Sequence, residues 1–172
     1  VGTMVEVLCE TDFVAKAPKF IELADKVLGQ AIATEATDAA ALLASTLDGE
    51  TVQELLDGAN ATIGEKIEIK RVARVTGEHV VSYLHRTSPD LPPQIGVLVA
   101  TEGGDDHIAR DVAMHVAAFS PTVLTREDVD ATTVDNERRL AEATAREEGK
   151  PEAALPKIIE GRVNGYFKEN VL

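Results

Sequence analysis

The single cysteine, Cys9, and His115, one of four histidines, form the candidate pair for covalent chemistry in this chain. A cysteine thiolate activated by a histidine base would be a nucleophilic catalyst. Nothing near Cys9 in the sequence is plainly basic, so nothing there favours the thiolate. A small buried residue in a strand explains Cys9 more simply. We keep a Cys/His enzyme as a remote alternative and expect no catalytic residue.

Residues 103–115 contain two glycines, several aspartates and two histidines, which are residue types found in metal and phosphate sites. His107 and His115 are spaced so that they lie roughly 80° apart around a helix, and therefore do not share a face. The chain has no HExxH motif and no cysteine pair. Gly103-Gly104 precedes an expected helix, but two aspartates follow and would repel a phosphate. We expect no metal site and no cofactor.

The segment Thr11-Asp12-Phe13-Val14 suggests binding rather than catalysis. Only 3% of the residues are aromatic, yet Phe13 stands in the connection between a strand and a helix. It could fold back on the first turn of that helix as a hydrophobic staple. Alternatively, a rigid loop presents Asp12 and Phe13 outward, and the ring is buried in a partner. Spacing alone leaves both interpretations open.

His115 poses a similar choice. It interrupts an apolar stripe at helical spacing that consists of Ile108, Val112, Val116 and Phe119. Either His115 is a core histidine with one hydrogen bond, or a partner protein completes this end of the stripe.

Composition limits the classes of partner. The formal charge is −13 and the isoelectric point is about 4.7, so the surface repels nucleic acid and anionic membranes. A lone cysteine forms no internal disulfide. No apolar run approaches the ~20 residues that span a bilayer, and no signal peptide is visible. We expect a cytoplasmic protein without direct nucleic-acid or membrane partners.

Hydrophobic periodicity and turn residues predict the elements. We expect strands at 3–9, 65–77, 78–86 and 94–104, and helices at 18–33, 38–45, 51–59, 105–119, 134–148 and 152–168. The strand 65–77 is expected to pair with 78–86 across a Thr76-Gly77 turn. The last two helices form a hairpin, because Gly149 and Pro151 provide a stop and a restart.

The strands cluster rather than alternate with helices, which favours an α+β fold with antiparallel sheets. Residues Val7, Leu8, Thr11 and Asp12 recur at one offset as Val97, Leu98, Thr101 and Glu102, which indicates two related lobes. We predict four parts in the chain. They are an N-terminal lobe at 1–86, a proline-rich linker at 87–93, a C-terminal lobe at 94–133 and a projecting helical hairpin with the start of a C-terminal segment at 134–172.

Several segments of the sequence resemble those of a known family. "VEVLCETDFVAK" closely resembles the signature of translation elongation factor Ts, the guanine nucleotide exchange factor for elongation factor Tu. Further segments match the family in order: "IGEKIEIKRVA", "YLHR", "IGVLVA", "HIARDVAMHVAA" and "EGRVNGYFKENVL". The resemblance implies two α+β lobes and a helical hairpin. It also implies a non-enzymatic factor that binds the Tu factor in its GDP or nucleotide-free form, dislodges Mg²⁺, promotes GDP release and stabilises the empty partner until GTP binds.

The resemblance also implies roles for individual residues. Asp12 and Phe13 correspond to the pair that enters the GTPase domain, and Thr11 and Val14 complete the segment associated with Mg²⁺ dislocation. Further GTPase contacts are expected from Ile95, Gly96 and His115.

The extent of the chain departs from the family. The N-terminal domain, which resembles a ubiquitin-associated fold, and the C-terminal end are missing, so we expect a fragment or a partly seen chain. A Tu-binding module or scaffold without exchange activity is therefore an alternative. The resemblance is compatible with a homodimer or a heterotetramer.

Overall fold

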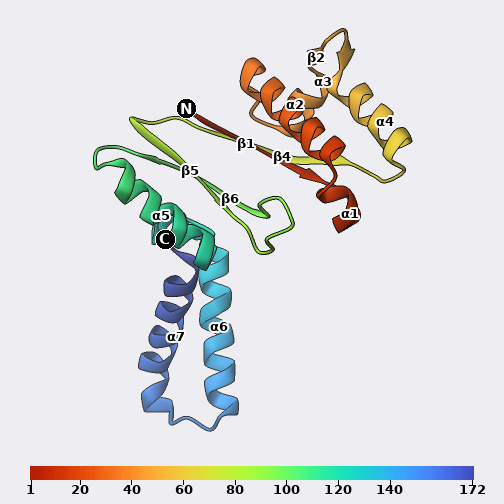
Figure 1. The fold of residues 1–172 in the computed structure, drawn as a ribbon. Coiled ribbons are helices and arrows are strands. Elements are labelled where there is room, and N and C mark those ends of the chain that lie inside the picture. Colours follow the sequence, from red (N-terminus) through yellow and green to blue (C-terminus); the bar gives the residue numbers. More distant parts are fainter. The chain divides into compact units, whose positions relative to one another are not determined.

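The computed structural model describes all 172 residues and divides them into two compact units, Val1–Ala117 and Ala118–Leu172. It contains helices and small antiparallel sheets, which confirms the predicted α+β class (Figure 1). In chain order the elements are β1 (Gly2–Leu8), α1 (Asp12–Ala15), α2 (Pro18–Thr34), α3 (Ala39–Ala44), β2 (Thr46–Leu47), β3 (Glu50–Thr51), α4 (Val52–Ile63), β4 (Glu68–Val75), β5 (His79–His85), β6 (Ile95–Thr101), α5 (Asp106–Phe119), the 3-10 turn η1 (Arg126–Asp128), α6 (Ala131–Glu147), the 3-10 turn η2 (Glu152–Ala154) and α7 (Leu155–Asn170).

Strand pairing differs from the prediction. β4 pairs antiparallel with β1, and β5 pairs antiparallel with β6, so the expected hairpin of residues 65–77 with 78–86 is wrong. The Thr76-Gly77 connection carries the chain from one sheet to the other instead. It passes over β6 so closely that a Cβ added to Gly77 would lie 2.9 Å from the Cβ of Ala100.

The proline-rich residues 87–93 form the loop of the β5–β6 hairpin. Arg86 donates a hydrogen bond to the carbonyl of Leu91 (2.8 Å), and the hydroxyl of Thr87 donates to the side chain of Gln94. The predicted division into two lobes at this loop stays a prediction.

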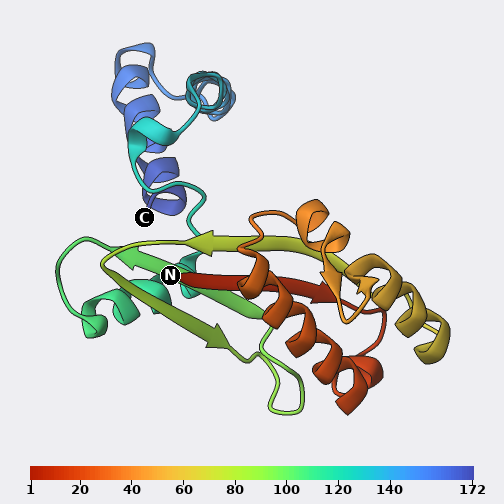
Figure 2. The same ribbon diagram turned by 90° about the horizontal axis from the view of Figure 1, so that it is seen from above.

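The first unit is layered. α2, α3 and α4 cover one face of the β1–β4 sheet, and the β5–β6 hairpin lies on the other face with α5 beyond it (Figures 1 and 2). The main core lies between the helices and the sheet, and its fully buried members include Val27, Leu42 and Val52. Side chains of β1 alternate, so Val5 and Val7 face this core. The guanidinium of Arg110 in α5 lies 5.5 Å from the ring centroid of Tyr83 in β5.

A β-bulge sets which residues of β4 face the core. Glu6 pairs with Arg71 and Val7 pairs with Ile69, so Lys70 is the extra residue. Because of this extra residue, Ile69 and Val72 both contribute to the core although they are three positions apart.

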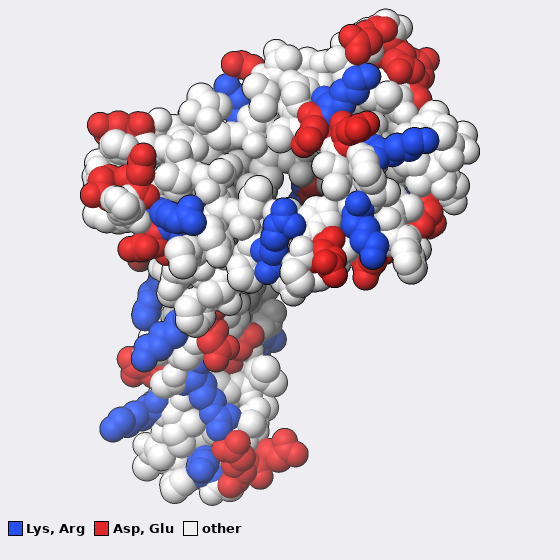
Figure 3. All heavy atoms as spheres, in the orientation of Figure 1, with Lys and Arg blue, Asp and Glu red and all other residues white.

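The arginines of β4 are ion-paired rather than gathered into a basic patch. Arg71 contacts Glu6 (2.6 Å), and Arg74 contacts Glu35 at the end of α2 (3.1 Å). On the face drawn in Figure 3, acidic and basic side chains are interspersed. No helix combines the length and the apolar character that crossing a membrane requires.

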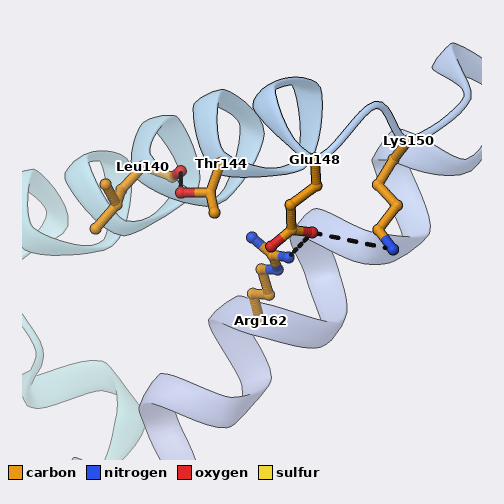
Figure 4. A network of polar contacts seen from close by, with 5 residues as sticks. All are labelled: Leu140, Thr144, Glu148, Lys150 and Arg162. Carbon is orange, nitrogen blue, oxygen red and sulfur yellow. Dashed lines mark hydrogen bonds and ion pairs between the residues drawn. The ribbon is translucent and has the colours of Figure 1, made fainter.

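The second unit confirms the predicted helical hairpin. α6 and α7 run side by side, joined through Gly149, which adopts a left-handed φ of 73°, and Pro151 (Figure 1). The small residues Ala141 and Ala145 are buried in α6. A polar network lies near the helix ends (Figure 4), where the carboxylate of Glu148 contacts Arg162 (2.7 Å) and Lys150 (4.0 Å). In the same view the hydroxyl of Thr144 donates to the carbonyl of Leu140 (2.8 Å).

Candidate functional site

Residues Thr11–Val14, which we call the TDFV turn, begin a single helical turn just after β1. Thr11 is the N-cap, and its hydroxyl accepts a hydrogen bond from the backbone N–H of Val14 (3.4 Å). The backbone N–H groups of Ala15 and Lys16 donate to the carbonyls of Thr11 and Asp12. The segment is therefore a short capped helix rather than an open loop.

Phe13 points away from the protein. The residue is 78% exposed, and its only ring contact is with the ammonium of Lys16, 5.2 Å from the centroid. A hydrophobic staple would bury this ring, so that interpretation is wrong and outward presentation is what the turn provides. The neighbouring Val14 packs against the main core and anchors the turn.

The carboxylate of Glu65 holds the start of this turn. One oxygen accepts from the backbone N–H groups of Glu10 (3.2 Å) and Thr11 (3.1 Å), and the other accepts from the hydroxyl of Thr11 (2.5 Å). Sequence reasoning missed Glu65, which lay within an expected strand. The one signal in the sequence was Gly64, because a glycine is suited to ending a helix and would thereby fix the position of the next residue, Glu65.

Cys9 is not set up as a nucleophile. Cys9 follows the last residue of β1 and is half-buried, so the expected buried position within the strand is wrong. Its thiol donates to the carbonyl of Thr11 (3.4 Å). Burial raises the pKa of the Cys9 thiol, and the negative charges of Glu65 and Asp12 raise it further. The thiol form is therefore favoured, which disagrees with the Cys/His enzyme alternative.

Ile95 and Gly96 open β6, where they pair with His85 and Leu84 of β5. Gly96 is exposed. It borders a cavity of about 540 Å³ that runs along β1 and α2. Thr11 and Asp12 border the same cavity, so the structure brings these three candidate residues together. Phe13, Val14, Ile95 and His115 are not among its lining residues.

His115 lies on α5 and is exposed, so its interpretation as a core histidine is wrong. The buried face of α5 consists of the small residues Ala109 and Ala113, which let the helix lie close to its neighbours. Ile108 and Phe119 of the expected apolar stripe are 57% and 67% exposed. The stripe is therefore largely an accessible apolar surface that includes His115. No group of three or more His, Cys, Asp or Glu side chains is arranged to hold a metal ion.

Comparison with known proteins places the chain in a family. The family model described as Elongation factor TS matches residues 10–172. Elongation factor Ts of Kineococcus radiotolerans is 67% identical over 171 residues, which cover 99% of this chain and 62% of that protein. The Beutenbergia cavernae protein of the same name is 62% identical over 172 residues, covering all of this chain and 61% of the relative. Elongation factor Ts of Renibacterium salmoninarum is 59% identical over 175 residues, which cover 100% of this chain and 63% of that protein.

The chain thus spans about 62% of the length of the curated relatives that it matches. The family match extends from the residue before the TDFV turn to the end of the α6–α7 hairpin and the last residue. On this basis, the chain belongs to the elongation factor Ts family.

Proposed function

We propose that this chain carries the partner-binding surface of a guanine nucleotide exchange factor for elongation factor Tu. In this proposal it binds the GDP-bound partner, dislodges Mg²⁺ and promotes GDP release. It then stabilises the nucleotide-free partner until GTP binds. The chain makes and breaks no covalent bond, so it is not an enzyme. The observation that carries the proposal is the exposed ring of Phe13 on a capped turn.

The energetics follow from linkage between two binding reactions. A factor that binds the empty GTPase better than the GDP-bound form must weaken GDP binding by the same factor. Accelerating GDP release a thousandfold lowers the barrier by about 4 kcal/mol. Burying one exposed aromatic side chain in a partner pocket contributes roughly 2 kcal/mol or more, a large share of that figure.

We assign Phe13 the role of a wedge that shifts the partner elements holding Mg²⁺. The ion is a large local charge in such a site, and its loss leaves the nucleotide phosphates without neutralisation. Asp12 competes for partner groups near the metal, while Thr11 and Val14 fix the geometry of the turn. Ile95, Gly96 and His115 brace the wedge through further contacts with the partner.

The test is stopped-flow release of a fluorescent GDP analogue from elongation factor Tu. Phe13→Ala should slow stimulated release on the order of tenfold or more, because a hot-spot side chain is lost. The control is Ile32→Ala, which removes an exposed apolar side chain from α2 outside the proposed surface. A Phe13→Ala protein that folds normally and stimulates release at the wild-type rate would overturn the proposal.

The alternative that the sequence analysis left open is a Tu-binding module without exchange activity. Co-elution with nucleotide-free elongation factor Tu, without any acceleration of GDP release, would favour this alternative. Separation of the pair on addition of GDP and Mg²⁺, together with accelerated release, would favour the exchange factor.

A further inference from the structure

We infer that Glu65 is a positioning residue for the TDFV turn, which it holds ready for a partner before binding. This inference rests on the proposed function, because it assumes that Phe13 is the group presented. Glu65 lies in the connection between α4 and β4, and it reaches across to the end of β1.

The contacts of Glu65 form a clamp of three hydrogen bonds. Its Oε2 accepts from two successive backbone N–H groups, those of Glu10 and Thr11, and its Oε1 accepts from the hydroxyl of Thr11. A carboxylate is the acceptor suited to such donors, because it offers two oxygens and hydrogen bonds to a charged group are strong. The clamp closes on the residue that caps α1.

The clamp also sets the orientation of the Thr11 hydroxyl. That hydroxyl has one proton, which it gives to Glu65, so its lone pairs remain for the N–H of Val14. The hydrogen-bond chain thus runs from Glu65 through Thr11 to the backbone on the far side of Phe13. Without the carboxylate, the hydroxyl is free to rotate and the cap is weakened.

Glu65 is itself held from both sides. Gly64 ends α4 in the left-handed region, with φ at 81°, and its N–H donates to the carbonyl of Asn60 (2.8 Å). The side-chain oxygen of Asn60 accepts from the N–H of Ile67 (2.7 Å), and Ile67 is buried in the main core. Through Glu65, the exposed TDFV turn is therefore hydrogen-bonded to a segment that the main core holds in place.

A turn that is ordered before binding loses less conformational freedom in the complex. Removal of Glu65 should therefore weaken the action of Phe13 without removing any proposed contact with the partner. Glu65→Ala should lower the kcat/KM of stimulated GDP release on the order of tenfold, which corresponds to loss of one or two net hydrogen bonds. Glu65→Gln keeps one acceptor oxygen and should recover part of that loss.

The experiment combines three measurements on the full chain. Hydrogen exchange of the isolated protein should show faster exchange at residues 10–16 in Glu65→Ala, with the main-core helix α2 unchanged. The kcat/KM of stimulated GDP release should fall about tenfold in Glu65→Ala and recover in part in Glu65→Gln. In the Phe13→Ala background, Glu65→Ala should cause a smaller loss than it causes in the wild type, because the clamp acts mainly through that ring. Asp38→Ala is the matched control, since it removes a capping hydrogen bond from α3 (2.8 Å) far along the chain from the turn.

The outcomes separate this inference from the proposed function. If Phe13→Ala is slow and Glu65→Ala stimulates at the wild-type rate, the inference alone is overturned. Unchanged hydrogen exchange in Glu65→Ala, losses that add to those of Phe13→Ala, or an equal loss in Asp38→Ala would each overturn it as well. If Phe13→Ala itself stimulates at the wild-type rate, the proposed function fails and the inference fails with it.

Discussion

The side chain of Met4 occupies the space next to Gly96, where two sheets meet. A Cβ added to Gly96 would lie 2.5 Å from the sulfur of Met4 and 2.9 Å from its terminal methyl group. β1 and β6 are brought together at this point, and the start of β6 is thereby placed beside the cavity that Thr11 and Asp12 also border. The absence of a side chain at position 96 is a condition for this arrangement.

Gly96→Ala should nevertheless fold, at a cost below about 1 kcal/mol, because the end of a methionine side chain moves easily. Gly77→Ala should cost more, about 1–3 kcal/mol, since the atom in its way is the Cβ of Ala100, which is fixed to the backbone. Urea unfolding followed by circular dichroism measures both. Equal losses for the two variants would contradict this prediction.

Glu54 should make stability depend on pH in the acid range. The backbone N–H and the hydroxyl of Thr51 donate to its carboxylate, and these bonds lower the pKa of Glu54. Because the pKa of Glu54 is lower in the folded protein than in the unfolded chain, its ionised carboxylate stabilises the fold. This stabilisation is fully present above the pKa of the unfolded glutamate, about 4.3, and is lost as the pH falls through the pKa of the folded protein. Thermal unfolding of the wild type and Glu54→Gln should therefore differ at neutral pH and converge in acid. Glu22→Gln, which removes an exposed carboxylate of α2, is the control for the loss of one negative charge.

Cys9 should react slowly with iodoacetamide while the protein is folded. Burial and the charge of Glu65 raise the pKa of its thiol, so the reactive thiolate forms at higher pH than in the unfolded chain. The alkylation rate, followed from neutral to alkaline pH with and without urea, should show the shift. Glu65→Gln should move the folded profile back toward that of the unfolded chain. Faster alkylation of the folded wild type would contradict the assignment of Cys9 as a structural residue.

The stability of the α6–α7 hairpin should depend on its small buried residues more than on its ion pairs. Ala145→Leu inserts side-chain volume at a fully buried position and should cost about 1–3 kcal/mol. Glu148→Gln removes the contacts with Arg162 and Lys150, whose side chains are 35% and 46% exposed, and should cost less than about 1 kcal/mol. Thermal unfolding measures the loss of stability in each variant. A larger loss in Glu148→Gln than in Ala145→Leu would contradict this prediction.

Local signals in the sequence predicted the elements well. The helix expected at 18–33 is observed at Pro18–Thr34, because a proline at the first turn and a strict apolar period are local features. Strand pairing was predicted less well. Thr76-Gly77 indicates a change in chain direction, but the bonding partners of β4 and β5 lie far away in the chain, and no local pattern ranks them.

The candidate site shows the same limit. The family resemblance assigned Asp12 and Phe13 a role, whereas spacing left the direction of the ring open until its exposure was known. The contact of Glu65 with Thr11 could not be predicted, since Gly64 indicates only the end of a helix and the two residues are 54 positions apart in the sequence. A contact of that kind depends on how the end of α4 is placed against the end of β1, and this placement is a property of the folded core.

The extra residue at Lys70 has a consequence for insertions and deletions. Loss of Lys70 would leave Ile69 and Val72 on the same side of a regular strand, because their separation would become two positions. Loss of a residue from the regular stretch after Arg71 would instead turn the remainder of the strand over and bring apolar side chains into water. Shorter homologous chains should therefore place their gap at the bulge.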